Sequence, residues 1–470
     1  MSLLSHRAWP FVAGALVGAA TATAGTWMSA RRRGLDARLV RALTRGRRGA
    51  PVVIVPGLLG SQLLREDGTA AWLNLGNALG HHHLGLPRRL PLTESRDNLR
   101  PGPLVGTDTI LPRAFGFTEY ADLIELLESA GFAPGVGHAG LRYAVFSYDW
   151  RRDLVESARA LGRALDTIAA DRGEPDARFH LLGHSMGGLV VRYYLRYGGE
   201  EPRDDAPITW AGARRIATAL LVATPNAGAM PALGAILTGE RLGLSYTTLA
   251  PSVVARMPSV YQLLPPAGTG VLLGASGAPI DADLHAPLTW ERFGWSPFGP
   301  TLDDRLSSER AFVKAALARA RAFHAALARR PETPCPVPVS LVGADCLPTL
   351  SRAVVGEGPA GSAPRFQPRT PGEQELMFEA GDGRVTRASL LAAHLGEVRG
   401  EGLTSGMPEV SQVYFGGADH HGLYADPAFQ SLILRLLVAP EPPPRHRYLD
   451  RVRAQSEPPE RAPSAQLTST

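Results

Sequence analysis

The residues best suited to chemistry lie near the middle of the chain, in the segment G-H-S-M-G at residues 183–187. This G-x-S-x-G spacing is typical of a nucleophile elbow, in which a serine occupies a sharp turn between a strand and a helix. Small residues two positions before and after the serine let neighbouring backbone pass without a steric clash. The pattern therefore predicts that Ser185 is a nucleophile, the alternative being a structural serine in a turn.

A serine is a weak nucleophile unless a histidine accepts its proton and an acid orients that histidine. In folds that carry this elbow, both partners follow the serine in the chain. Residues 417–423 (G-A-D-H-H-G-L) place two histidines between an expected strand and an expected helix, where such folds position the base. His420 is the preferred base, because Leu423 three residues later can pack the loop down. His421 is the alternative.

Two aspartates qualify as the acid. Asp382 lies in the glycine-flanked segment G-D-G-R-V at residues 381–385, and such a loop could bring a carboxylate to the base. Asp345 directly follows an expected strand at residues 337–343, which is the usual position of the acid in these folds. The residues alone leave the two equally good.

An ester carbonyl under attack also needs two N–H donors where negative charge develops. The N–H of Met186, directly after the nucleophile, is the first expected donor. The loop P-G-L-L-G at residues 56–60 follows an early strand, and the N–H of Leu58 is the second.

The apolar segments around these residues alternate between strand-like and helix-like patterns, as they do in a parallel sheet with crossover helices. We therefore expect an α/β-hydrolase fold with a mostly parallel sheet over residues 49–438. The expected strands are residues 51–55, 143–147, 180–182, 216–223, 337–343 and 410–415. The expected helices are residues 119–130, 152–170, 188–195 and 427–438.

One long stretch interrupts the alternation. Residues 226–332 are rich in Gly, Pro, Leu and Trp, and an insertion at this point predicts a cap over the active site. Past Pro440 the chain becomes proline-rich and polar, which predicts a disordered tail over residues 439–470.

The N-terminal residues 1–48 combine an apolar run with a basic linker. Residues 8–30 carry no charge and are long enough to span a bilayer. Arg31, Arg32 and Arg33 follow the run, and by the positive-inside rule they would leave the catalytic domain in the cytoplasm. A membrane anchor is the favoured interpretation; a signal sequence for export and a peripheral or soluble helix are the alternatives.

Composition narrows the function classes. The net charge of +5 comes from 49 basic and 44 acidic residues, and no basic stripe interleaved with aromatic residues is present, which excludes nucleic-acid binding. The adjacent histidines at residues 81–83 cannot all face one ion, so we expect no metal and no cofactor.

Together these segments resemble the lecithin–cholesterol acyltransferase family, which includes phospholipid:diacylglycerol acyltransferases, lysosomal phospholipase A and bacterial lipase-like relatives. The resemblance covers residues 51–436. Its markers are residues 51–63, 115–116, 148–151, 183–187, 223–228, 257–265, 347–349 and 381–385.

The resemblance implies that Asp382 rather than Asp345 is the acid, although Arg384 stands where the family pattern G-D-G-T-V has threonine. It also implies that Leu58 is an oxyanion donor and that residues 62–117 correspond to a lipid-interface region. Residues 148–151 (Y-D-W-R) are interpreted as scaffold, with a buried Asp–Arg pair and a packing tryptophan.

The expected function is acyl transfer from a lipid ester through an acyl-Ser185 intermediate, as in a lipase, a phospholipase or an O-acyltransferase. The partners would be the lipid ester, a lipid alcohol if acyl transfer occurs, and a membrane surface. Hydrolysis is favoured, because the chain departs from the sterol-acylating pattern. The alternatives are a catalytically inactive lipid-binding or membrane-scaffold protein, and a short-chain esterase or protease on the same fold.

Overall fold

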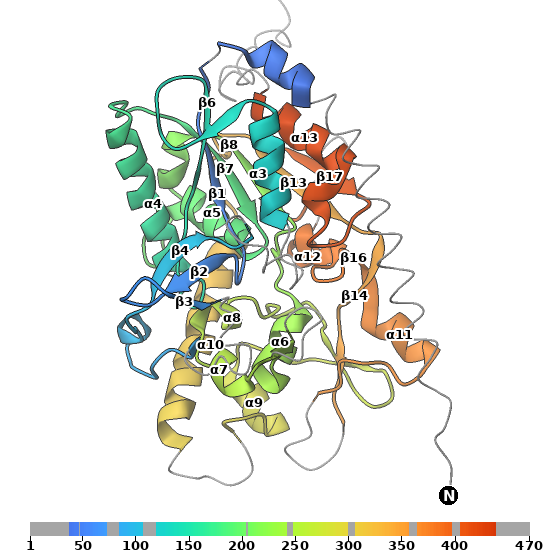
Figure 1. Ribbon diagram of the computed structural model, residues 1–470. Helices are drawn as coiled ribbons and strands as arrows, with labels where there is room; N and C mark the ends of the chain where they lie inside the picture. The colour runs from blue at the N-terminus through green and yellow to red at the C-terminus, as the bar shows by residue number, and fades with distance from the viewer. Residues whose placement is uncertain are drawn as a thin grey trace, which may run out of the picture.

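The computed structural model is organised around a central sheet of seven parallel strands (Figure 1). It describes residues 37–46, 48–72, 84–106, 119–203, 205–241, 248–298, 306–356, 364–396 and 405–438. In spatial order the strands are β17 (Gln412–Gly416), β13 (Val339–Ala344), β8 (Ile216–Val222), β7 (Phe179–His184), β1 (Val52–Val55), β6 (Leu141–Val145) and β5 (Phe132–Pro134).

The central strands are buried on both faces, as continuous apolar runs in parallel sheets usually are. All four residues of β1 are buried. Val53 and Val55 pack with the helices of one face, and Val52 and Ile54 pack with those of the other. The side chains of a strand alternate between two apolar layers, so helices must cover both faces.

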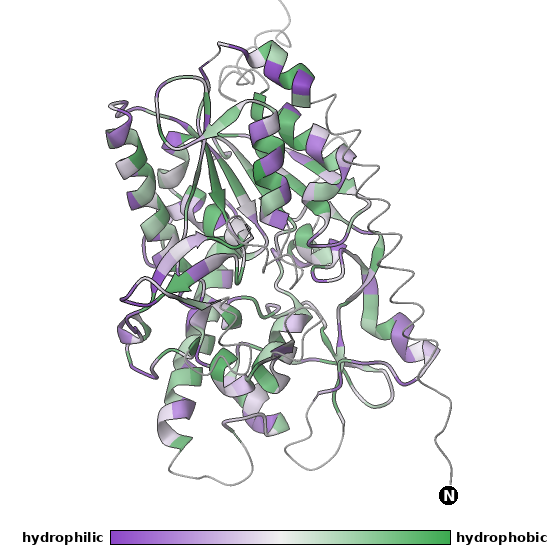
Figure 2. Ribbon diagram, in the orientation of Figure 1, coloured by the Kyte–Doolittle hydropathy of each residue, from purple (hydrophilic) through white to green (hydrophobic). Residues whose placement is uncertain are grey.

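Helices α4 (Leu154–Asp171) and α5 (Met186–Tyr197) cover one face, and α3 (Glu119–Ser129) and α13 (Pro427–Val438) cover the other. Figure 2 shows hydrophobic residues concentrated in the sheet and mixed with hydrophilic ones along the outer helices. The expected strands and helices of the sheet are confirmed to within two residues at each end. Strand β5 was not expected.

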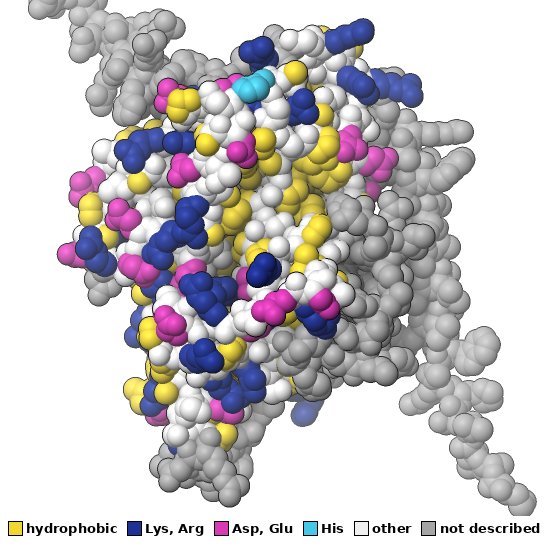
Figure 3. Space-filling view, turned by 60° about the vertical axis from the view of Figure 1, so that its left-hand side comes forward, with side chains coloured by type: hydrophobic (Ala, Val, Ile, Leu, Met, Phe, Trp, Pro, Cys, Tyr) yellow, Lys and Arg dark blue, Asp and Glu magenta, His cyan; other side chains and the backbone are white. Residues whose placement is uncertain are grey.

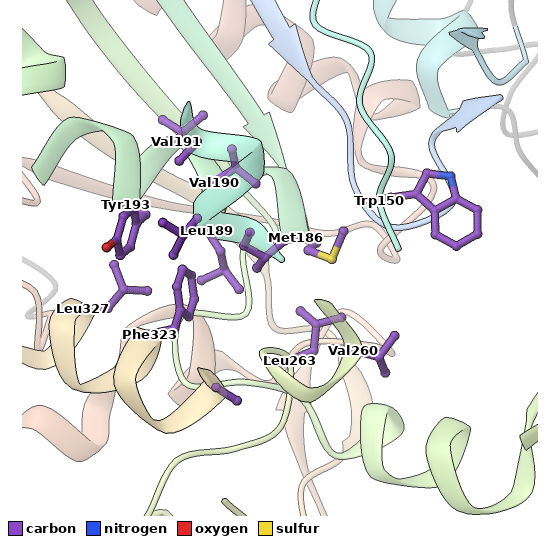
Figure 4. Close-up of a cluster of buried hydrophobic side chains, with 14 of the residues drawn as sticks. Trp150, Met186, Leu189, Val190, Val191, Tyr193, Val260, Leu263, Phe323 and Leu327 are labelled. Atoms are coloured by element: carbon purple, nitrogen blue, oxygen red, sulfur yellow. The ribbon is translucent and has the colours of Figure 1, made fainter. Parts of the chain in front are cut away.

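A second group of helices lies between β8 and β13 in the chain and gathers at one end of the sheet (Figure 1). It comprises α6 (Met230–Thr238), α7 (Pro251–Val254), α8 (Pro258–Tyr261), α9 (Pro287–Phe293) and α10 (Ser307–Ala328), with the short strands β9 (Glu240–Arg241), β10 (Thr248–Leu249), β11 (Leu272–Leu273) and β12 (Pro279–Ile280). Figure 4 shows side chains of α5 meeting Phe323 and Leu327 of α10, so the core continues from the sheet into this group.

Small antiparallel sheets complete the molecule. Strand β2 (Ser61–Leu64) pairs with both β3 (Ala70–Trp72) and β4 (Arg100–Leu104), and β14 (Leu347–Leu350) pairs with β16 (Phe378–Gly381). The remaining elements are β15 (Ala353–Val354), α11 (Pro371–Met377), α12 (Arg387–Leu390), a helix at residues 37–44, and 3-10 turns at Leu92–Glu94, Ala211–Arg215, Ala393–Leu395 and Leu423–Ala425.

The surface carries charges of both signs. On the face drawn in Figure 3, hydrophobic side chains gather in the middle, and basic and acidic side chains alternate around them.

Several sequence predictions lie outside the described residues. These are the possible anchor at residues 8–30, the histidines at residues 81–83, the marker at residues 115–116 and the tail at residues 439–470. Within the described ranges, no helix is both long and apolar enough to cross a bilayer. The membrane anchor therefore stays a prediction.

Candidate active site

Ser185 lies at the turn between β7 and α5, with φ 53° and ψ −125°. A non-glycine residue rarely adopts such a positive φ, and strain of this kind concentrates at functional sites. The serine N–H donates to the carbonyl of Val222 on the neighbouring strand at 2.7 Å. The sheet thus holds the strained turn, which has the geometry expected of a nucleophile elbow.

Gly187 explains why the elbow needs a small residue after the serine. A Cβ at this position would lie 2.2 Å from the carbonyl oxygen of Val55 and 2.4 Å from that of Pro56. Both contacts are to backbone, which cannot move aside cheaply. The glycine therefore allows the end of β1 to pass directly against the start of α5.

The structure brings the three predicted triad residues together. His420 Nε2 lies 3.1 Å from Ser185 Oγ, and His420 Nδ1 lies 2.8 Å from Asp382 Oδ2. The His420 N–H also donates to the Asp382 carbonyl at 2.8 Å, so the loops after β17 and β16 are joined through backbone as well. These distances allow a proton to pass from the serine to the histidine.

Asp382 is held as a carboxylate. It is only 2% exposed, and its Oδ1 accepts hydrogen bonds from the N–H groups of Arg384 at 2.9 Å and Val385 at 2.7 Å. Burial acts to raise the pKa of this carboxyl group, but His420 and the two N–H donors outweigh burial and bring the pKa below its usual value. An ionised Asp382 can orient His420 and stabilise its imidazolium form.

The two alternative triad members make other contacts. The Asp345 carboxylate pairs with Arg387 at 2.8 Å. His421 Nδ1 lies 3.4 Å from a carboxylate oxygen of Glu119. Burial acts to lower the pKa of His421, but Glu119 outweighs burial and raises it above the usual value. Among the described residues, neither side chain forms a hydrogen bond or an ion pair with Ser185.

The two predicted oxyanion donors flank the nucleophile. Met186 begins α5, where the first N–H groups of a helix have no partner within the helix. Gly57, directly before Leu58, lies so close that a Cβ on it would be 2.9 Å from the Cβ of Ser185. Within the described part of the chain, the N–H groups of Leu58 and Met186 donate to no protein acceptor. Both are thus available to a substrate oxygen.

Sequence reasoning missed two residues at this site. The Tyr120 hydroxyl lies 2.8 Å from His184 Nδ1, and the His184 ring packs 5.2 Å from that of His420 between centroids. Burial lowers the pKa of His184 well below its usual value, so this histidine is neutral. The G-x-S-x-G pattern leaves the second position open, and nothing in the local sequence connects it to Tyr120.

A cavity of about 370 Å³ reaches Ser185 and His420. Its polar margin includes Glu240, Arg384 and His421. The rest of the lining is apolar and comes from the loop at residues 56–60, the scaffold tryptophan, the segment between β8 and β13, and the loop after β16. These residues are Leu58, Leu59, Trp150, Pro225, Ala229, Pro231, Ala232, Ala235, Leu249, Val254, Met257, Val260, Leu263 and Val385. An apolar pocket with a few polar groups at one place is typical of a small-molecule site.

Arg384, which departs from the family pattern, lies at this margin. Its guanidinium pairs with the Glu240 carboxylate at 2.8 Å, and the pair joins the loop after β16 to β9. Arg384 therefore forms part of the margin of the cavity, and Asp382 keeps its contact with His420.

The scaffold interpretation of residues 148–151 is confirmed. Arg151 is fully buried and pairs with the carboxylates of Asp149 and Asp97 at 2.7 Å each. The indole N–H of Trp150 donates to the Ser61 carbonyl at 2.9 Å. Trp150 also lines the cavity, which the sequence did not indicate.

Comparisons with known proteins bear on the fold and the family. The family model described as lecithin:cholesterol acyltransferase matches residues 112–290. The expected resemblance is confirmed over this stretch, which includes the elbow, α8 and much of the helix group after β8. None of the curated proteins matches the sequence.

Solved structures with 12–14% sequence identity resemble the chain. A chain from the crystal structure of the Tle4–Tli4 complex is 13% identical with a TM-score of 0.50, over 83% of this chain and 98% of that one. Lipase BlEst2 of Bacillus licheniformis is 12% identical (83% and 92% covered, TM-score 0.33), and lipase 1 of Pelosinus fermentans is 14% identical (84% and 99% covered, TM-score 0.33). Together with the parallel sheet and the elbow, the first likeness supports the expected α/β-hydrolase fold.

Proposed function

We propose that the protein is a serine acyl hydrolase or O-acyltransferase that acts on lipid esters through an acyl-Ser185 intermediate. One observation carries the proposal: Ser185, His420 and Asp382 are joined by hydrogen bonds, and Ser185 and His420 line an apolar cavity of about 370 Å³. The triad supplies acyl-transfer chemistry, and the cavity has the lining that a fatty-acyl chain would need.

In the first half-reaction, His420 Nε2 takes the Ser185 proton while Oγ attacks the ester carbonyl carbon. The carbonyl π electrons move to its oxygen, which the N–H groups of Leu58 and Met186 stabilise. The intermediate then collapses, the bond to the alkoxy oxygen breaks, and His420 returns the proton to the leaving alcohol. Asp382 stabilises the imidazolium throughout.

In the second half-reaction, His420 removes a proton from an acceptor whose oxygen attacks the acyl-Ser185 carbonyl. Collapse of that intermediate returns the proton to Ser185 Oγ. Water as acceptor yields a fatty acid, and a lipid alcohol yields a new ester. Hydrolysis is the expected outcome, because the sequence departs from the sterol-acylating branch of the family that it resembles.

We further propose that helices α6 to α10 form the cap over this site. Residues of α6, α7 and the α8 segment line the cavity, among them Ala232, Val254 and Val260. Burying an acyl chain against them would stabilise binding by roughly 0.8 kcal/mol per methylene. The cap would thereby favour long acyl chains over acetyl or butyryl esters.

The test is turnover of p-nitrophenyl esters of graded acyl length by wild type and Ser185→Ala, with and without a lipid alcohol such as a monoacylglycerol. We expect wild type to prefer long chains and Ser185→Ala to lose at least about 10³-fold in kcat, because the nucleophile is gone. Fatty-acid release indicates a lipase, and diversion of the acyl group into a new ester indicates an acyltransferase. Equal activity of the two folded proteins would refute the proposal.

A further inference from the structure

The peptide that joins Pro56 to Gly57 is held at both of its polar ends by buried tyrosine hydroxyls. The Tyr148 hydroxyl donates to the Pro56 carbonyl oxygen at 2.8 Å. The Gly57 N–H donates to the Tyr120 hydroxyl oxygen, also at 2.8 Å. Tyr120 and Tyr148 are 2% and 3% exposed, so water does not compete for these bonds.

The next peptide, which carries the Leu58 N–H, is tied as well. Its carbonyl belongs to Gly57 and accepts from the Gly60 N–H at 3.2 Å. The Leu59 carbonyl accepts from the indole N–H of Trp72 at 2.9 Å. Because glycine can adopt many backbone conformations, Gly57 could otherwise rotate and turn the Leu58 N–H away from the nucleophile.

Tyr120 also connects this loop to the elbow. Its oxygen accepts from Gly57, so its own proton is directed to His184 Nδ1 at 2.8 Å. His184 is buried and neutral, which lets its Nδ1 accept a hydrogen bond from the Tyr120 hydroxyl. His184 directly precedes Ser185, so one hydroxyl joins the loop of Leu58 to the turn of the nucleophile.

We propose that Tyr120 and Tyr148 are positioning residues that fix the Pro56–Gly57 peptide, so that the Leu58 N–H points to the substrate oxyanion. This inference rests on the proposed acyl-transfer function. The tyrosines touch no reacting atom and act through the loop. Their hydroxyls should therefore stabilise the transition state more than the bound substrate.

The test compares Tyr120→Phe and Tyr148→Phe with the control Tyr197→Phe. Tyr197 also donates a buried hydrogen bond, to the Ala326 carbonyl at 2.9 Å, but it joins α5 to α10. We expect each of the first two variants to lower kcat by about 10- to 100-fold with KM nearly unchanged, less than the roughly 10²–10³-fold for removing an oxyanion donor outright. The control should keep wild-type kcat.

An alkyl trifluoromethyl ketone provides a second readout, because its adduct with Ser185 carries an oxyanion. Its inhibition constant should rise in Tyr120→Phe and Tyr148→Phe by the factor by which kcat/KM falls, and stay constant in the control. Melting temperatures identify which variants are folded. Folded variants with wild-type kcat and inhibition constant would overturn the positioning role. Failure of the acyl-transfer function itself would appear separately, as undiminished activity of Ser185→Ala.

Discussion

At the scale of single residues, three polar side chains reach one point from three separate loops. Ser185 follows β7, Asp382 follows β16 and His420 follows β17. The elbow pattern predicted the serine, and the loop between the last strand and the last helix predicted the histidine. The residues alone could not choose the acid, because Asp345 occupies the usual position directly after β13. The β14–β16 pair carries the chain to Asp382, and that non-local pairing has no local sequence signal.

Replacement of the acid tests this arrangement. Asp382→Asn keeps an oxygen for the N–H groups of Arg384 and Val385 but loses the negative charge beside His420. We expect kcat to fall by about 10³- to 10⁴-fold, because the histidine is no longer held in the tautomer that accepts the serine proton. The measurement is ester turnover at constant pH.

Asp345→Asn is the matched control. Its carboxylate pairs with Arg387, which is 42% exposed, so the variant should stay within a few-fold of wild type. A larger loss in Asp345→Asn than in Asp382→Asn would show that the acid has been misassigned.

The loop at residues 56–60 could be predicted from the sequence only in part. The positions of Leu58 and Met186 follow from the order of strand, loop and elbow. The contacts of Tyr120 and Tyr148 with the Pro56–Gly57 peptide join residues 63 and 92 positions apart. Such contacts depend on the packing of α3 and β6 against β1, so no local pattern predicts them.

At the scale of elements, α5 must be held firmly because it begins at the nucleophile. All twelve of its residues are buried. Arg192 and Arg196 project from it to the carboxylate of Glu409, at 2.7 Å each for the nearest atoms. The sequence predicted the helix from its apolar period. Nothing near Arg192 and Arg196 in the sequence indicated that Glu409, more than 200 positions later, is their partner.

We expect a large loss of stability when Glu409 loses its charge. Glu409→Gln would leave two buried guanidinium groups without a counter-charge, and we expect the free energy of unfolding to fall by about 3–5 kcal/mol near pH 7. Glu201→Gln is the control, since Glu201 is 50% exposed in its pairs with Arg159 and Arg319 and should cost less than about 1 kcal/mol. Urea unfolding gives both values.

The stability difference between wild type and Glu409→Gln should depend on pH. Burial acts to raise the pKa of Glu409, but the two arginines outweigh burial and lower it from 4.5 to about 2. A lowered carboxyl pKa stabilises the folded state above the unfolded value and ceases to do so as pH falls through the folded value. The stability gap between wild type and Glu409→Gln should therefore be full above pH 4.5 and narrow toward pH 2. A gap that stays constant over this range would contradict the ion-pair explanation.

At the scale of the whole molecule, the loops after β7 and β17 of the central sheet supply Ser185 and His420, and the small β14–β16 sheet supplies Asp382. The segment between β8 and β13 supplies most of the cavity lining. The alternating pattern predicted the central sheet, because buried parallel strands and amphipathic crossover helices have distinct apolar periods. It did not predict β5, which has three residues, or the small antiparallel sheets. The position of the insertion between β8 and β13 was predictable. Its short helices α7, α8 and α9 were not, because they have only four to seven residues.

The most direct test of the account is the mass of the protein during turnover of a slowly hydrolysed long-chain ester, such as p-nitrophenyl palmitate quenched in acid. We predict an adduct of one palmitoyl group on the peptide that contains Ser185, weaker labelling by the acetyl ester, and no adduct in Ser185→Ala. An adduct on another residue would contradict an acyl-Ser185 mechanism. So would equal turnover by folded wild type and Ser185→Ala with no adduct on either protein.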